Sequence, residues 1–249
     1  KLMHVDRIDF YPENYPTRAY YPFTLELFHK IRTLALETPV TLFVGENGTG
    51  KSTLLEAFAA RCGIYIWQGP KRQRYENNPY ESRLCDYISV NWRNGRVPGS
   101  FFGSSVFQDF ARVLDEWALT DPGQLDYFGG KSLISQSHGQ SLMAYFRSRY
   151  TRTGIYLMDE PETALSPRTQ IDLVDLLIKM SRAGHAQFVI ATHSPILLAC
   201  PGARIYSFDQ APIRSLSYEE TDHYQLFKAF MENPRGFFDA KQANGMASS

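Results

Sequence analysis

One stretch decides the fold of this chain: Gly45-Glu46-Asn47-Gly48-Thr49-Gly50-Lys51-Ser52. It satisfies the G-x-x-x-x-G-K-[ST] pattern of a phosphate-binding loop. Residues 41–44 before it predict a short buried strand. Residues 51–61 after it carry apolar side chains at helical spacing, with Gly63 as a stop signal. Strand, glycine loop and helix in this order predict an α/β fold of the P-loop type.

The residue types of this loop suit a triphosphate. Glycines let backbone N–H groups close around phosphates, and the start of the helix faces the negative charge. Lys51 is expected to bring a positive charge to the β and γ phosphates, and Ser52 a hydroxyl to Mg²⁺. A glycine turn followed by a surface lysine is the alternative, which the strand and helix context disfavours. We predict that ATP is bound by Gly45, Glu46, Asn47, Gly48, Thr49, Gly50, Lys51, Ser52 and Thr53.

A second motif follows later in the chain, where the apolar residues 155–158 end in Asp159, Glu160 and Pro161. Side chains alternate along a strand, so neighbouring carboxylates at its end cannot do the same job. We predict that Asp159 joins Ser52 as a Mg²⁺ ligand and that Glu160 is the general base toward the attacking water. By itself the motif could be a polar strand end that opens a turn. The phosphate loop favours chemistry, because ligands bind outside the carboxyl ends of parallel strands.

Composition narrows the class of protein. The 249 residues carry 26 Lys plus Arg and 26 Asp plus Glu, so the formal net charge is zero and no sequence-wide attraction to nucleic acid or membrane is expected. A local basic face stays open. Three cysteines without C-x-x-C spacing indicate free thiols in a reducing compartment. No apolar run approaches the roughly 20 residues that span a bilayer, and no secretory signal is evident. We expect a cytoplasmic protein without a transmembrane segment.

The remaining pattern predicts one domain, residues 1–241, with a helical lobe of about residues 100–152 inserted and a disordered tail at 242–249. The central sheet is expected to be mostly parallel, with antiparallel strands near the N-terminus. The expected strands are an edge strand at 3–10, a short strand near 87–90, and buried strands at 155–158 and 187–191. The expected helices are 106–119, 140–150 and one that begins at Ser166 and Pro167 and stops at Gly184.

The order of these motifs resembles the ABC ATPase superfamily. Ser137, Gly139 and Gln140 match part of its L-S-G-G-Q signature, although His138 replaces a glycine. In that superfamily this helix start contacts the γ-phosphate of an ATP held by the other subunit, which makes these three residues candidates for nucleotide binding. Ser137 as a helix N-cap only is the alternative.

His193 ends the next strand, where the superfamily carries a histidine that contacts the γ-phosphate. The predicted catalytic residues are therefore Lys51, Glu160 and His193. Residues 163–167 lie at the place of the superfamily's D-loop, which crosses the dimer interface, but Ser166 and Pro167 also make an ordinary helix start. Candidates for the Q-loop glutamine are Gln68, Gln73 and Gln108, and candidates for the aromatic that stacks on adenine are Tyr11, Tyr15, Tyr20 and Tyr21.

The resemblance runs through most of the chain, with 137–140, 159–167, 190–198 and 218–224 similar to a group of soluble bacterial ATPases related to chromosome-maintenance, repair and defence heads. Glu219, Glu220 and His223 in the last of these stretches are interpreted as surface polar residues. The resemblance implies hydrolysis of Mg-ATP in an ATP-dependent, head-to-tail homodimer that drives a conformational switch on a protein or nucleic-acid client. The alternative is the cytosolic ATP-binding subunit of a membrane ABC transporter.

Overall fold

The computed structural model describes residues 3–66, 78–103, 116, 118–119, 121, 123 and 138–238. Its centre is a six-stranded sheet in the order β5-β6-β7-β3-β8-β9. All neighbouring pairs in this sheet are parallel except β8 and β9. The strands are β3 (Val40–Val44), β5 (Gly99–Gly103), β6 (Gly154–Asp159), β7 (Ala186–Ala191), β8 (Arg204–Ser207) and β9 (Arg214–Leu216).

Alternation along the buried strands separates two apolar layers. Leu42 faces one layer and Phe43 the other, and Met158 and Leu157 divide in the same way on β6. Strands buried on both faces explain why their sequences are continuous apolar runs rather than alternating ones. The predicted mostly parallel sheet is confirmed.

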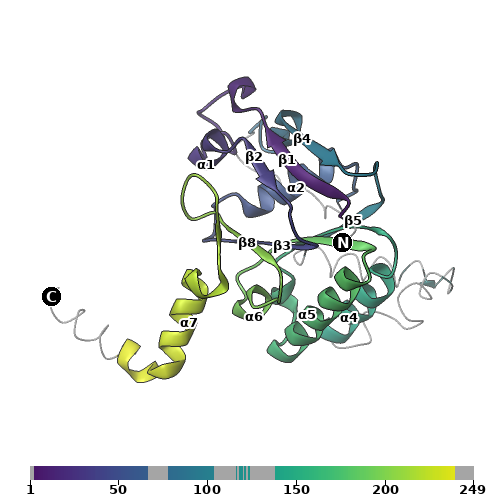
Figure 1. Ribbon diagram of the computed structural model, residues 1–249, viewed down its shortest axis with the longest axis vertical. Helices are drawn as coiled ribbons and strands as arrows, with labels where there is room; N and C mark the ends of the chain where they lie inside the picture. The colour runs from purple at the N-terminus through teal and green to yellow at the C-terminus, as the bar shows by residue number, and fades with distance from the viewer. Residues whose placement is uncertain are drawn as a thin grey trace.

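Helices cover both faces of the sheet (Figure 1). On the lower face in that view lie three helices, α4 (His138–Arg149), α5 (Pro167–Arg182) and α6 (Pro195–Leu198), whose buried residues join the layer of Leu42. On the upper face lies α2 (Lys51–Arg61), and beyond it α1 (Glu26–Lys30) and a small sheet. The 3-10 turns are η1 (Pro12–Asn14), η2 (Arg83–Tyr87), η4 (Pro161–Ala164) and η5 (Tyr218–Glu220).

The small sheet is antiparallel, in the order β2-β1-β4, with β1 at Val5–Phe10, β2 at Thr33–Ala35 and β4 at Ile88–Trp92. Antiparallel N-terminal strands are therefore confirmed, but the predicted edge position of residues 3–10 is wrong because β1 pairs on both sides. Gln187 of β7 ties this sheet to the central one. Its amide accepts the N–H groups of His4 and Val5 and donates to the Val5 carbonyl, each over 2.9 Å.

A further correction concerns the start of the helical lobe. The sequence predicts that the lobe begins near residue 100, but residues 99–103 form β5 and pair in parallel with β6. Gly99 shows why pattern reading missed this strand: a Cβ there would lie 2.5 Å from the carbonyl oxygen of Ile155, so packing demands a residue that strands usually avoid. The predicted helix 106–119 and tail 242–249 lie largely or wholly outside the described residues.

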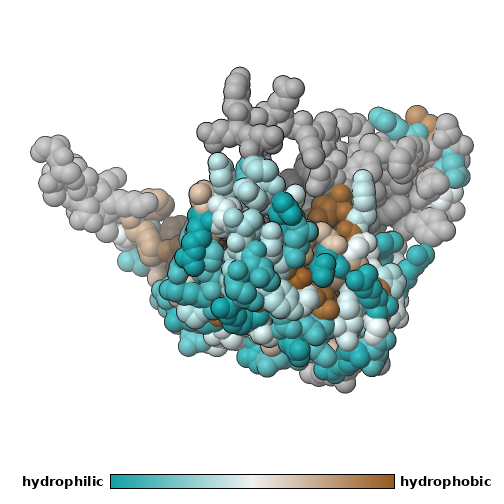
Figure 2. Space-filling view, turned by 90° about the horizontal axis from the view of Figure 1, so that it is seen from above, coloured by the Kyte–Doolittle hydropathy of each residue, from teal (hydrophilic) through white to brown (hydrophobic). Residues whose placement is uncertain are grey.

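The last described helix, α7 (Asp222–Glu232), extends away from the body of the molecule (Figure 1). Leu226, Phe227 and Met231 on it are exposed, and Figure 2 shows hydrophobic residues on the side where the described chain ends. No helix within the described ranges is long and apolar enough to cross a membrane.

Candidate active site

The site forms where three neighbouring strands end at one edge of the sheet. Asp159 pairs with Ala191, and Ala191 pairs with Phe43, so β6, β7 and β3 end at the same level. Hydrogen bonds continue past the strands: the Glu160 N–H donates to the Ala191 carbonyl over 2.9 Å, and Thr192 to Phe43 over 3.0 Å. The segments after these strands therefore start side by side.

The phosphate loop leaves β3 in a conformation that needs glycine. Gly48 and Gly50 have φ angles of 81° and 99°, in the left-handed region that side chains disfavour. A Cβ at Gly50 would also lie 2.9 Å from the Leu25 side chain. Asp209 braces the loop from outside, because its Oδ1 accepts the Glu46 N–H over 2.7 Å. Within the loop, Thr49 Oγ1 donates to the Glu46 carbonyl over 2.8 Å.

Lys51 begins α2 and is buried, with 4% of its surface exposed. Its ammonium group donates to the Gly45 carbonyl over 2.5 Å and to the Glu46 carbonyl over 2.8 Å, inside the curve of the loop. Burial lowers the pKa of Lys51, and the nearby carboxylates of Glu160, Asp209 and Asp159 oppose that shift. A buried ammonium that is hydrogen-bonded to neutral carbonyl groups is suited to an anionic ligand.

Ser52, the residue after Lys51, contacts Asp159. Ser52 Oγ donates to Asp159 Oδ1 over 2.9 Å. Burial raises the pKa of Asp159 to about 6, and the charge of Glu160 adds to the shift while Ser52 opposes it. A hydroxyl and a buried carboxylate at hydrogen-bond distance form the oxygen donor set that suits Mg²⁺ held jointly with phosphates. Among the described residues no group of three or more His, Cys, Asp or Glu could hold a metal by itself.

Glu160 adopts the left-handed conformation, with φ 47° and ψ 52°. Among the described residues it is the one non-glycine residue with a positive φ angle. This backbone conformation costs a non-glycine residue about 1–3 kcal/mol of folding free energy. Pro161 follows and opens η4. This turn brings Glu160 Oε1 to 3.5 Å from His193 Nε2, at the adjacent strand end.

His193 is half-buried and has contacts on three sides. Its backbone N–H donates to Glu162 Oε1 over 2.6 Å, and its Nδ1 lies 3.2 Å from Nε2 of His223. Its Nε2 is buried without a hydrogen-bond partner among the described residues. Burial lowers the pKa of His193, and the positive charge of Lys51 adds to the shift, which favours the neutral imidazole.

Of the three predicted signature residues, the structure describes Gly139 and Gln140, and it places Gly139 beside α5. Gly139 and Gln140 lie in the first turn of α4, where a Cβ on Gly139 would be 3.4 Å from Thr169 Oγ1 in α5, and Gln140 is exposed. Ser137 lies outside the described residues, as do all three candidate Q-loop glutamines, Gln68, Gln73 and Gln108.

The four candidate aromatics differ in surroundings. Tyr21 is beside the phosphate loop, because its hydroxyl is hydrogen-bonded to Thr53 in the first turn of α2. Tyr15 packs on Phe23 and donates to the Phe28 carbonyl, which makes it a core residue. Tyr20 packs on Tyr80, and Tyr11 bonds to Ser89. Proximity thus favours Tyr21 over the other three.

Three residues of the site were missed by reasoning from the sequence. Asp209 braces the loop from the end of β8, and Glu162 holds the backbone of His193. His223, interpreted as a surface residue, contacts the His193 ring. The Asp-Glu-Pro-Glu spacing was a usable signal for Glu162, whereas the contacts of Asp209 and His223 arise only from the tertiary fold.

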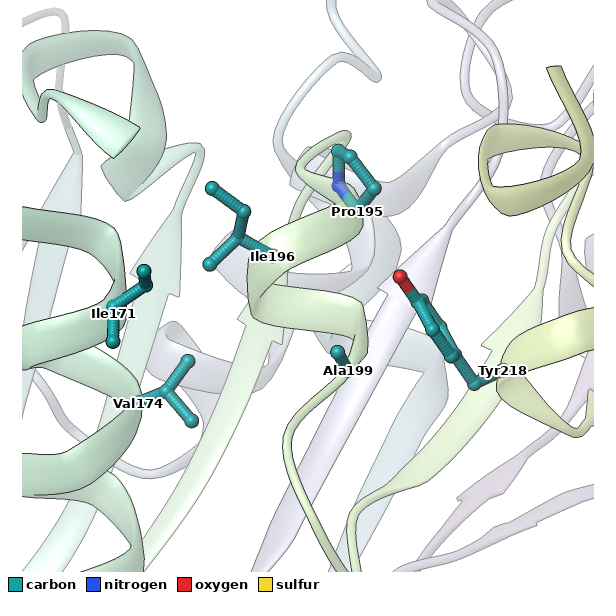
Figure 3. Close-up of a pocket in the computed structure, with 6 residues that line it drawn as sticks. All are labelled: Ile171, Val174, Pro195, Ile196, Ala199 and Tyr218. Atoms are coloured by element: carbon teal, nitrogen blue, oxygen red, sulfur yellow. The ribbon is translucent and has the colours of Figure 1, made fainter. Parts of the chain in front are cut away.

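An apolar hollow of about 400 Å³ lies beside the site, over α6. Figure 3 shows Ile196 between the α5 residues Ile171 and Val174 on one side and Tyr218 on the other. Pro195 and Ala199 complete its lining, and none of the predicted site residues takes part. The phosphate-binding edge and this hollow are therefore separate features.

Comparisons with known proteins relate this chain to ATPase domains and ATP-binding proteins. Residues 136–198 match the family model described as AAA ATPase domain, and residues 18–81 match that of an AAA domain. The probable siderophore transport system ATP-binding protein YusV of Bacillus subtilis is 26% identical over 186 residues, 65% of this chain and 63% of that protein. The hemin import ATP-binding protein HmuV of Streptomyces coelicolor is 30% identical over 182 residues, 67% of this chain and 63% of that protein.

Solved structures agree on the fold. CbiO1 from Clostridium perfringens, part of the ABC transporter complex cbiONQ, has a TM-score of 0.51 at 18% identity. The matched region covers 94% of this chain and 97% of the CbiO1 chain. An SmcHead bound to the C-winged helix domain of ScpA has a TM-score of 0.51 at 13% identity, covering 88% of this chain and 99% of its own.

The fold and the site define a P-loop nucleoside triphosphatase, with a phosphate loop before α2 and acidic residues at the end of β6. The relatives place it more narrowly. The chain resembles P-loop ATPases of the ABC type, and it spans 63% of the length of both curated relatives named above.

Proposed function

We propose that this chain binds Mg-ATP at the common edge of β3, β6 and β7 and hydrolyses it when two copies pair head to tail. The observation that supports binding most directly is the meeting of Lys51, the Ser52–Asp159 pair and the Glu160–His193 pair around one glycine loop. Positive charge, metal ligands and a carboxylate base thus share one small volume, as hydrolysis of a phosphoanhydride requires.

Each side chain has a separate role. Lys51 exchanges its bonds to the loop carbonyls for bonds to phosphate oxygens. Ser52 and Asp159 would hold Mg²⁺, which would supply positive charge to neutralise the phosphates. Glu160 accepts a proton from the water that attacks the γ-phosphorus, and the leaving group is ADP. His193 Nε2 donates a hydrogen bond to the γ-phosphate and orients it.

Pairing of two copies is supported by where the signature residues lie. Gly139 faces α5 rather than the phosphate loop of its own chain. We infer that the start of α4 binds a phosphate held by a second copy, which is how the resembled superfamily uses this helix. A head-to-tail pair would complete both sites at once, and a single copy should hydrolyse ATP slowly.

The work driven by hydrolysis is proposed to be a conformational switch on a protein or nucleic-acid client. A second candidate, the ATP-binding subunit of a membrane transporter, is favoured by the names of the curated relatives, which are ATP-binding proteins of import systems. The two candidates differ in the partner that the ATP-bound pair retains.

The Glu160→Gln variant tests the proposal. Removal of the base should reduce turnover by about 10²- to 10⁴-fold and leave an ATP-bound dimer that light scattering detects. Glu232→Gln is the matched control, because Glu232 is an exposed carboxylate at the last residue of α7. Unchanged hydrolysis in the Glu160 variant would remove the assigned base.

The same trapped dimer separates the client classes. We would recover it from cells with and without nuclease treatment, and from membrane and soluble fractions. Retention that nuclease abolishes indicates a nucleic-acid client, and retention in membranes favours the transporter candidate. An affinity for nucleic acid should also depend on ATP and fall steeply with salt.

A further inference from the structure

His223 comes from a part of the sequence that the proposed site does not use. It lies near the start of α7, and its Nε2 is 3.2 Å from Nδ1 of His193. Its own Nδ1 is buried without a hydrogen-bond partner among the described residues. The two rings are tilted by 43° with centroids 5.3 Å apart, so the contact runs nitrogen to nitrogen rather than by stacking.

The start of α7 holds His223 in place. Thr221 is fully buried, and its hydroxyl oxygen accepts the N–H of Tyr224 over 3.2 Å while donating to the Tyr218 carbonyl over 2.7 Å. The rings of Tyr218 and Tyr224 also meet edge to face at 4.8 Å. A capped and packed first turn leaves His223 little freedom to move away from His193.

The partner of His193 differs from those of other histidines in the chain. Nε2 of His4, His29 and His185 lies on the backbone carbonyls of His185, Phe23 and Tyr150, respectively. A carbonyl oxygen only accepts, so each of those rings must carry its proton on that nitrogen. In the pair formed by His193 and His223 either ring can donate, and the surroundings decide.

The surroundings of His193 Nε2 favour one arrangement. Its neighbour at 3.5 Å is Glu160 Oε1, which is an acceptor when ionised. If His193 donated from Nδ1, a bare lone pair on Nε2 would face that carboxylate and any phosphate oxygen. If His223 donates from Nε2, the proton of His193 lies on Nε2 and points at acceptors.

We propose that His223 is a positioning residue that fixes His193 in the tautomer with the proton on Nε2, so that His193 presents a donor to the γ-phosphate. This inference rests on the proposed function for its consequence, but the tautomer itself is a property of the ligand-free protein. It also places the first turn of α7 in direct contact with the residue that senses the terminal phosphate.

The test is NMR of the ligand-free chain labelled with ¹⁵N in its histidines. The chain has six histidines, and the signals of His193 are assigned by their absence in His193→Gln. We expect Nδ1 of His193 to be unprotonated in the native protein. In His223→Leu we expect a mixture of tautomers, and in His223→Gln, whose amide can still donate, the native tautomer.

The turnover number kcat should depend on which tautomer His193 adopts. His223→Leu is expected to lower kcat about 10-fold, the scale of outer-shell partners, with KM little changed, and His223→Gln should recover most of that loss. Lys228→Gln on the exposed face of α7 is the control for effects of the helix itself.

Two results would overturn the inference: a protonated Nδ1 on His193 in the native chain, or an unchanged tautomer and kcat in His223→Leu. Because the NMR signal needs no ATP, failure of the proposed ATPase function would leave the tautomer readable. Conversely, the wrong tautomer in an active enzyme would reject only the role of His223.

Discussion

Two polar clusters at opposite ends of β7 are built in opposite ways. At its start, Gln187 is fully buried and its amide makes three hydrogen bonds to the backbone of β1 and its neighbour. Beyond its end, Nε2 of His193 and Oε2 of Glu162 are buried without partners among the described residues. Burial also raises the pKa of Asp159 in the second cluster.

This difference distinguishes a cluster that stabilises the fold from a cluster that is suited to bind a ligand. Buried polar groups are normally hydrogen-bonded, because an unpaired one costs about 1–3 kcal/mol. The Gln187 cluster obeys this rule and joins two sheets. The second cluster, which we call the catalytic edge (Lys51, Ser52, Asp159, Glu160, Glu162 and His193), departs from it at Glu162 and His193 and also contains the strained backbone of Glu160. Such departures are expected where a ligand completes the interactions.

The largest effect is expected from Lys51→Met. The loss of a charged donor to two phosphates should weaken ATP binding by about 4 kcal/mol, or roughly 1000-fold in Kd. Isothermal titration calorimetry with Mg-ATP measures it, and Lys228→Met on α7 is the control. An unchanged Kd would mean that the catalytic edge is not where ATP binds.

A substitution in the Gln187 cluster, whose polar groups are hydrogen-bonded, should change the free energy of unfolding rather than ATP binding. Gln187→Leu leaves two backbone N–H groups and one carbonyl of the N-terminal strand segment without partners, so the free energy of unfolding should fall by about 3 kcal/mol. Urea denaturation checks this value. The remaining folded protein should bind Mg-ATP as the native chain does, since Gln187 contacts β1 and not the phosphate loop.

Asp159→Asn should act in the opposite direction. The folded pKa of Asp159, about 6, lies above its ordinary value of 3.8, so the folded state binds the proton more tightly. The carboxylate therefore destabilises the fold above about pH 6, and this cost disappears as the pH falls toward 4. In chelator at pH 8 we expect Asp159→Asn to be more stable by on the order of 2 kcal/mol. The gain should vanish near pH 4, and a gain that persists there would contradict the assigned cause.

The smallest effect tests whether the hydrogen bonds of a polar side chain, rather than its position near the catalytic edge, decide how its removal changes stability. Ser194 follows His193 directly, yet its hydroxyl is fully used: it accepts the N–H groups of Ile196 and Leu197 and donates to Gln170 Oε1. Ser194→Ala should therefore lower the free energy of unfolding by about 1 kcal/mol, as loss of a helix cap does. A stability gain, like that expected for Asp159→Asn, would contradict the distinction.

Local sequence signals predicted the parts of the fold that obey local rules. The strands next to the phosphate loop and to Asp159 are continuous apolar runs, and α5 begins at Ser166 and Pro167 as its capping residues indicate. β5 was not predicted because close packing on Ile155 requires Gly99, and glycine is a residue that strands usually avoid. The short elements α1 and β2 carry too few residues for a period to show.

The site divides in the same way. Lys51, Ser52, Asp159 and Glu160 lie within two motifs, each of which reflects a single turn or strand end, and the fold brings Ser52 to Asp159. Asp209 and His223 reach the site from later segments through β8 and α7. No short-range pattern records which strand end lies beside the loop, so only the fold could identify them.

The central claim is that the catalytic edge is completed by Mg-ATP, and thermal unfolding with and without the nucleotide tests it most directly. For the Glu160→Gln variant, Mg-ATP at about 100 times its Kd should add roughly 2.7 kcal/mol to the unfolding free energy, and Lys51→Met in the same background should abolish the gain. An identical unfolding curve with and without Mg-ATP would contradict the account.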